Sequence, residues 1–269
     1  MLTLCSSVVT EINRNVAATL KACGPAILSQ DDGNLMKEIV TVISTLITRS
    51  HPCQQDLGDE DLDQEAEEGS SEYDWLVIDT ALDVVIGLAV ALGPAFAELW
   101  KVFEQPILKF AASESQNIER STGVGVIAEC ASNMEAAVTP YTPKLLTLLL
   151  KRLSDADQET KSNAAYATGQ LIFNSTDSAT YLPQYPTILR KLEPMLQIQD
   201  ARIKDNAAGC LCRMIMAHPD KVPIADVLPA LIGLLPLKDD FEENTPVYQC
   251  LFKLCKSLPL AFLSCRIIH

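Results

Sequence analysis

The sequence predicts an all-α fold, a superhelix of stacked helix pairs with about six repeats and an acidic loop insertion. Three observations predict it. Of the 269 residues, 48% are hydrophobic but only 6% are aromatic, so the core has to be built from Leu, Ala, Val and Ile, as is typical of packed helices rather than of sheets. A short segment recurs 43 residues further along the chain, and prolines introduce the apolar stretch before each copy.

The recurring segment occupies residues 157–165 (DQETKSNAA) and 200–208 (DARIKDNAA). The stretch before each copy begins with two prolines, which a first helical turn tolerates because its N–H groups have no partner there. The repeating unit is therefore a helix A, a short turn and a helix B. A two-helix period of about 40 residues is that of HEAT and armadillo repeats, whereas ankyrin and tetratricopeptide units have about 33 and 34.

Within the first copy, helix A is expected over 143–153, with leucines spaced so that they lie on one face. Asp155 or Asp157 is expected to cap helix B, whose alanines and glycine let neighbouring helices approach closely. The same register predicts B helices at 2–23, 73–92, 116–132 and 242–256, and A helices at 34–48, 96–110 and 224–235.

The acidic residues are concentrated in one segment. The net charge is −14, and residues 56–74 hold ten acids and no base, against 25 acids and 21 bases elsewhere. Such a segment predicts a solvated, disordered loop over 54–72, which is either a spacer or an acidic competitor for basic ligands. The loop separates repeat helices at 1–53 from repeats at 73–258, and 259–269 form an atypical tail. Since neither end looks like a polar capping repeat, we expect a piece of a longer array.

Composition also indicates which classes of protein to set aside. An acidic chain is unsuited to nucleic acid. The apolar stretch 75–96 contains Asp79 and Asp83 and ends at Gly93-Pro94, which favours a buried core helix over a membrane span. Nine cysteines, an odd number lying mostly in apolar helical patterns without a secretory signal, indicate reduced thiols in the cytosol or nucleus.

No pattern in the sequence indicates catalysis, a cofactor or a metal. The three histidines are scattered, and Cys210 and Cys212 are two residues apart, so their side chains diverge on a helix. Gly123 and Gly125 lie inside a helical pattern rather than in a phosphate loop. Acidic pairs such as Asp79 with Asp83 are typical of solvated helix faces. We therefore expect a binding protein and no enzyme.

One polar residue recurs at the same place in successive B helices. Aligning these helices by their small residues makes Asp79, Glu119, Asn163, Asn206 and Glu243 equivalent. Stacked along the inner, concave surface, they would form a track of acceptors for a basic peptide.

On the same face, Tyr166 and Gln170 would flank a lysine side chain. The alternative is that Asn163 and Asn206 only satisfy backbone groups between repeats. We expect the nearby bases Lys161, Arg202 and Lys204 to pair with Asp157, Asp200 and Asp205.

Several segments resemble the C-terminal HEAT repeats of the karyopherin-β (importin-β) family of nuclear import receptors, namely 125–129, 161–164, 202–207, 227–231 and 234–243. The resemblance covers about 70–255 well and the first 50 residues weakly. It implies a cytoplasmic and nuclear receptor that binds basic cargo, such as core histones and ribosomal proteins, on a concave face. Carried over by position, it nominates Glu119, Asn163, Tyr166, Asn206, Glu242 and Glu243.

The resemblance leaves room for nucleoporins as further partners, and we expect no counterpart in this chain of the repeats that bind the GTPase Ran. The alternative function is a general HEAT-repeat scaffold for protein–protein interaction, unrelated to nuclear transport. Such a scaffold would hold its partner through exposed apolar residues and with little dependence on salt.

Overall fold

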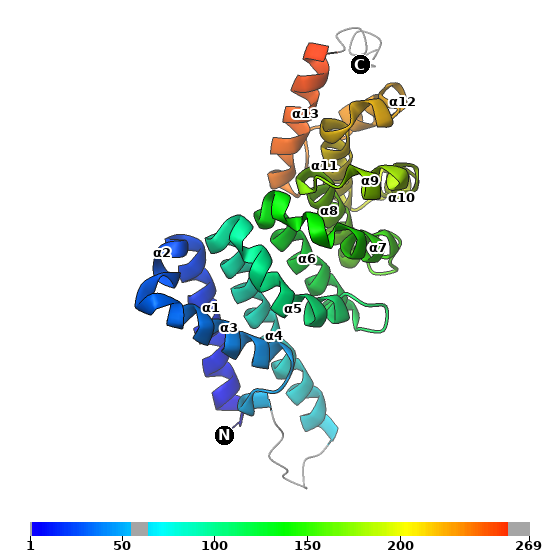
Figure 1. Ribbon diagram of the computed structural model, residues 1–269. Coiled ribbons are helices and arrows are strands. Elements are labelled where there is room, and N and C mark those ends of the chain that lie inside the picture. Colours follow the sequence, from blue (N-terminus) through cyan, green and yellow to red (C-terminus); the bar gives the residue numbers. More distant parts are fainter. Residues whose placement is uncertain (1, 55–63, 258–269) are drawn as a thin grey trace. The chain divides into compact units, whose positions relative to one another are not determined.

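The computed structural model describes residues 2–54 and 64–257, and these form helices without a strand (Figure 1). This confirms the prediction of an all-α protein built from stacked helix pairs. The chain divides into two compact units, Met1–Phe110 and Ala111–His269, which are described separately below. The predicted tail 259–269 lies outside the described residues.

The long helices that the structure describes in the first unit are the four that the repeat predicts for it, α1, α3, α4 and α5. Its elements are α1 (Leu2–Cys23), α2 (Pro25–Leu28), η1 (Gln30–Gly33), α3 (Asn34–Ile47), η2 (Pro52–Gln54), α4 (Gln64–Leu92), η3 (Gly93–Ala95) and α5 (Phe96–Phe110).

Helices α1 and α4, both predicted as B helices, pack side by side. Gly87 of α4 permits this approach, because a Cβ atom there would stand 3.2 Å from the carbonyl oxygen of Ala17. Asn13 is 4% exposed and donates from Nδ2 to Oγ1 of Thr80 at 3.2 Å. A buried amide thus links two consecutive B helices of this unit, since an unpaired polar group at this place would destabilise the fold.

Helix α4 begins at Gln64, earlier than the predicted start at Tyr73. Residues 64–72 are therefore helical, which corrects that part of the predicted loop 54–72, while 55–63 lie outside the described residues. The reason is local, because Gln, Glu and Ala are strong helix formers and acids are favoured near a helix N-terminus.

The apolar part of this unit is largely interior. The helical stretch Asp74–Phe110 is long and apolar enough to cross a membrane by length and composition, and 61% of its most apolar window is buried inside the structure. Side chains such as Val77, Ile78 and Leu88 are fully buried. Trp100 and Phe103 of α5 are buried as well, as expected for core helices.

The second unit repeats the pair of helices more regularly. Its elements are α6 (Asn117–Met134), η4 (Glu135–Tyr141), α7 (Thr142–Arg152), α8 (Gln158–Asn174), α9 (Ser178–Tyr181), η5 (Leu182–Gln184), α10 (Tyr185–Gln197), α11 (Ala201–Ala217), η6 (Pro219–Lys221), α12 (Ile224–Gly233), η7 (Phe241–Glu243) and α13 (Asn244–Ser257).

In this unit the B helices α6, α8, α11 and α13 pack successively against one another. The A helices α7, α10 and α12 lie together on the other side (Figure 1). Asp157 and Asp200 cap the two matching B helices, accepting from the amides of Thr160 at 2.8 Å and Ile203 at 3.0 Å. The repeated aspartates of the sequence therefore fix where these helices begin.

No disulfide bond joins the cysteines in the part of the chain that the structure describes. Cys53, Cys130, Cys210, Cys212 and Cys250 are buried, and Cys23 and Cys255 are exposed. Burial raises the pKa of the Cys210 thiol to about 12. The buried thiols therefore serve as small apolar side chains of the core.

Candidate functional site

The predicted ladder begins in one unit and continues in the other. Asp79 is half-buried in α4 of the first unit. The second unit holds the other positions, namely Glu119, Asn163, Asn206 and Glu243.

Asn163 and Asn206 link consecutive B helices. Asn163 of α8 is half-buried and donates from Nδ2 to the carbonyl oxygen of Ser121 in α6 at 3.0 Å. Asn206 of α11 is 2% exposed and donates from Nδ2 to Oγ of Ser162 in α8 at 3.0 Å. The alternative considered for the two amides was that they satisfy backbone groups between repeats. Asn163 does so, whereas Asn206 bonds to a side-chain hydroxyl. Their binding of cargo stays a prediction, and Asn163 is the one that retains exposed surface.

Glu119 of the ladder and Glu242, which the family resemblance nominates, differ in exposure. Glu119 is half-buried in the first turn of α6, and its carboxylate accepts from the backbone amide of Gln116 at 3.2 Å. Glu242 is exposed in η7. Both carboxylates therefore have surface on which a cationic partner can act.

Glu243 is the buried acid of the ladder in the second unit, 1% exposed. Its two carboxylate oxygens accept from Arg213 of α11, Nη1 to Oε2 at 2.6 Å and Nη2 to Oε1 at 2.9 Å. Burial raises the pKa of Glu243, and the hydrogen bonds and charge of Arg213 offset part of that rise. The structure thus gives Glu243 the role of joining η7 to α11.

A glycine makes room for this contact. A Cβ atom on Gly209 would stand 1.3 Å from Oε2 of Glu243, so any larger residue at 209 would displace the carboxylate. Gly209, Arg213, Glu243 and Tyr166 are called the Glu243 centre below.

Tyr166 joins this centre from α8. The Arg213 guanidinium lies over its ring, with 5.4 Å from Cζ to the ring centroid. One face of the ring therefore already holds a cation, which the sequence did not predict. Burial, then the charge of Glu129, raises the pKa of Tyr166, and a hydrogen bond with Gln170 opposes the rise. Tyr166 stays half-buried, whereas Gln170 is only 8% exposed.

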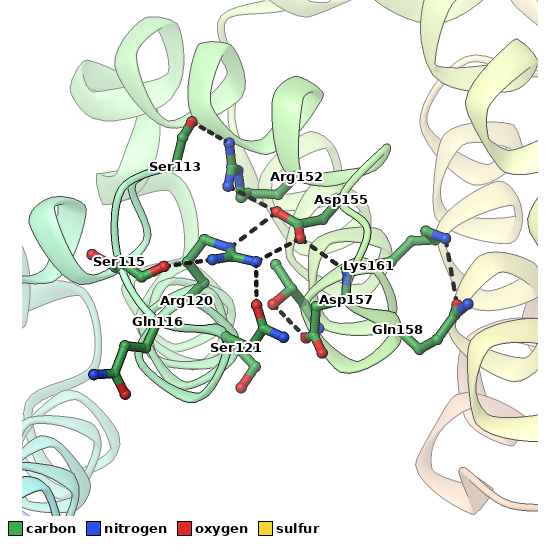
Figure 2. Close-up of polar contacts among 12 residues, drawn as sticks. Ser113, Ser115, Gln116, Arg120, Ser121, Arg152, Asp155, Asp157, Gln158 and Lys161 are labelled. Carbon is green, nitrogen blue, oxygen red and sulfur yellow. Dashed lines mark hydrogen bonds and ion pairs between the residues drawn. The ribbon is translucent and has the colours of Figure 1, made fainter.

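A second buried carboxylate lies between α6, α7 and α8, as Figure 2 shows. Asp155 accepts from Nη2 of Arg120 at 3.0 Å and from Nη1 of Arg152 at 2.8 Å. It also accepts from the backbone amide of Asp157 at 3.1 Å. Burial alone would raise the pKa of Asp155, but these hydrogen bonds and the two arginine charges outweigh it and hold that pKa below its ordinary value. Asp155, Arg120 and Arg152 are called the Asp155 centre.

The predicted pairing of the nearby bases was wrong. Lys161 contacts Oε1 of Gln158 at 3.4 Å, and Arg202 lies 3.9 Å from Glu159. Asp205 is buried and accepts from three successive backbone amides of the loop before η7, those of 238, 239 and 240, at 2.8–3.0 Å. A cluster of amides satisfies a buried carboxylate better than a flexible lysine, because less side-chain entropy is lost.

Sequence reasoning missed the arginines. Arg213 is a lone charge in the apolar run CLCRMIM of α11, and such a residue usually has a buried partner. The lone arginine was therefore a usable signal. Its partner Glu243, however, lies 30 residues further on, across a turn whose path the sequence pattern does not specify. Arg120 meets Asp155 by the same kind of long-range contact, 35 residues apart, whereas Arg152 is only three residues from Asp155 and was within reach of a local argument.

The arrangement of the B helices in the second unit suits the binding of a peptide. Among the residues that the structure describes, no group of three or more His, Cys, Asp or Glu side chains is placed to hold a metal. The B helices instead offer half-buried acids, amides and an aromatic ring on a rigid support of inter-repeat hydrogen bonds. Such a face can accept a cationic side chain and the backbone of an extended peptide.

Known proteins are similar to this chain along most of its length. A probable importin subunit beta-4 of Schizosaccharomyces pombe is 38% identical over 224 residues, 81% of this chain and 21% of that protein. Importin-4 of Homo sapiens is 31% identical over 255 residues, 94% of this chain and 23% of that protein, and importin-4 of Mus musculus is 30% identical over 239 residues, 88% and 21%. This chain belongs to the importin-β family.

The importin-β family is one of nuclear import receptors, which confirms the resemblance drawn from the sequence. The chain spans about a fifth of the length of the curated relatives it matches. No protein-family model matches it.

Proposed function

We propose that this chain is part of a nuclear import receptor and that its second unit binds lysine-rich segments of protein cargo along the B helices. The observation that carries this is the similarity to importin-4 proteins over as much as 94% of the chain. The cargo class is basic protein, with core histones and ribosomal proteins as the expected examples. The receptor would work in both cytoplasm and nucleus, with nucleoporins as further partners.

The exposure of the predicted residues supports two different roles for them, contact with the peptide and support of the helices. Glu119, Asn163, Tyr166 and Glu242 keep exposed surface and are proposed to contact the peptide. Gln170, Asn206 and Glu243 are 8%, 2% and 1% exposed, so we propose that they hold the helices that carry the contact residues. Asp79 is proposed as a further contact in the first unit.

Binding of this kind is tested by fluorescence anisotropy with a labelled peptide in which lysines alternate with glycine and serine. The affinity should fall steeply as salt is raised, because exposed charges are screened within about 10 Å at 0.1 M salt. Glu119→Lys and Glu242→Lys should each weaken binding by about tenfold at low salt, since each replaces an attraction with a repulsion. Glu193→Lys on α10 is the matched control, as Glu193 is an exposed acid on an A helix.

Equal affinity of the three charge-reversal variants would remove the assignment of the contact residues to the B helices. An affinity that does not change with salt would instead favour a scaffold that grips partners through apolar surface. The exposed aromatics Phe241, Tyr248 and Phe252, at 66%, 50% and 61% exposure, are where such a partner would bind. Alanine at Phe252 would then weaken binding, while the acid substitutions would not.

A further inference from the structure

The contact between α6 and α8 brings together two side chains that the repeat alignment did not pair. Asn163 fixes the register of the two helices through its 3.0 Å bond to Ser121, and its Nδ2 lies 3.5 Å from where a Cβ atom on Gly125 would be. One turn further along both helices come Glu129 of α6 and Tyr166 of α8. Burial raises the pKa of Tyr166 most, followed by the charge of Glu129, and the charge of Glu243 contributes less.

The two faces of Tyr166 have different neighbours. The Arg213 guanidinium covers one face at 5.4 Å, and Arg213 is in turn neutralised by Glu243. Glu129 belongs to α6, the helix on the opposite side of α8 from α11. Tyr166 and Glu129 are both half-buried, so each residue keeps accessible surface.

A second aromatic ring follows on the same side of α8. Tyr166, Gln170 and Phe173 are spaced by four and three residues, which places them on one helix face. Gln170 is 8% exposed and hydrogen-bonds to Tyr166, so it fixes the orientation of the ring. Phe173 is 50% exposed although it is a large apolar side chain. An acid beside two partly exposed rings is the combination that receives a cationic side chain with an aliphatic stem.

We propose that Glu129, Tyr166 and Phe173 form a subsite for one lysine side chain of a bound peptide, between α6 and α8. The Glu129 carboxylate neutralises the ammonium group, and the two rings cover the methylene stem. This subsite rests on the proposed binding of lysine-rich segments and adds to it an acid that the predicted track did not contain. The guanidinium of Arg213 already covers the far face of Tyr166, so the ammonium group is left the side toward Glu129.

The test uses the full chain and the labelled lysine peptide, together with a series of peptides in which one lysine at a time is replaced by norleucine. Glu129→Gln removes the charge but keeps the shape, and Glu193→Gln removes one charge from α10 as the matched control. At low salt, Glu129→Gln should weaken binding by about fivefold and Glu193→Gln by less than about twofold. Phe173→Ala should weaken binding by about threefold, because the stem loses its cover. Thermal denaturation of each variant checks that the fold is retained.

The norleucine series decides whether one lysine occupies the subsite. For one peptide position, the replacement should remove the difference between wild type and Glu129→Gln, because the interaction is then already absent. If wild type binds the lysine peptide but Glu129→Gln binds as tightly as Glu193→Gln, the subsite is overturned while the proposed function stands. If wild type does not bind the peptide at all, both are overturned.

Discussion

Asp155 and Glu243 are both buried carboxylates that join helices of consecutive repeats, with side chains 6% and 1% exposed. Asp155 has two arginine partners and a backbone amide, whereas Glu243 has Arg213 alone. The pKa of Asp155 is lowered, and that of Glu243 is raised. Two sites with the same purpose thus differ in which protonation state the fold favours.

The difference has two causes, because Glu243 is the more deeply buried of the two and has one arginine where Asp155 has two. Moving a carboxylate out of water costs several kcal/mol, and a single arginine returns only part of that cost. At Asp155 the second arginine and the backbone amide of Asp157 offset the remaining cost of taking the carboxylate out of water. The Asp155 centre is therefore expected to stabilise the unit, and the Glu243 centre to determine where η7 sits rather than how stable the unit is.

The largest expected effect is that of Asp155→Asn. Arg120 and Arg152, with side chains 10% and 8% exposed, would lose their shared carboxylate. Breaking a buried ion pair from one side costs about 3–5 kcal/mol, so the free energy of unfolding in urea should fall by that amount. Asp226→Asn, at an exposed acid of α12, is the control and should change it by less than about 0.5 kcal/mol. Similar losses in both variants would show that the network contributes nothing.

A smaller loss is expected for Gly209→Ala. The new Cβ atom would overlap Glu243, from whose Oε2 it would stand 1.3 Å. The displaced carboxylate would leave Arg213 buried and unpaired, while alanine favours the helix by about 1 kcal/mol, so we expect a net loss of about 2 kcal/mol.

The control for this substitution is Gly125→Ala in α6, where the nearest atom would be 3.5 Å from the Cβ atom. It should leave stability unchanged or raise it by up to about 1 kcal/mol. A stabilising Gly209→Ala would mean that Glu243 does not occupy the space over that glycine.

The smallest effect concerns pH. Glu243 has a raised pKa in the fold, so its protonated form is favoured and wild type should gain stability relative to Glu243→Gln as the pH falls from 7 toward 4.5. Asp155 has a lowered pKa, so its contribution is complete above about pH 4 and is lost as the pH falls through the folded value. From pH 7 toward 4.5, the contribution of Glu243 to the free energy of unfolding in urea should grow while that of Asp155 stays constant. Below about pH 4, the contribution of Asp155 should fall. Parallel curves for Asp155→Asn and Glu243→Gln would contradict the comparison.

Much of the fold follows from local signals in the sequence. Proline in first turns, Asp157 and Asp200 at N-caps and the leucine spacing of α7 each act within one helix, so helix positions are predictable from them. The stacking of Asn163 and Asn206 followed from the repeat period, which is also a property of the sequence.

The chemistry of the site was less predictable. Arg213 meets Glu243 across 30 residues, and the role of Gly209 depends on the path of η7. Likewise, Asp205 binds amides of a loop rather than a lysine of its own turn. These contacts depend on how neighbouring repeats pack, and the repeat pattern places the helices without specifying which side chains fill the space between them.

A lysine-rich peptide that lies along the B helices of the second unit can be located most directly by photo-crosslinking. A peptide carrying a benzophenone group beside a lysine is irradiated in the complex, and the crosslinked residues are located by mass spectrometry. We expect crosslinks within α6, α8 and η7, concentrated near Glu129, Tyr166 and Glu242. These crosslinks should disappear at high salt, because the attraction between the charges is then screened. Crosslinks concentrated on the A helices α7, α10 and α12 would contradict it.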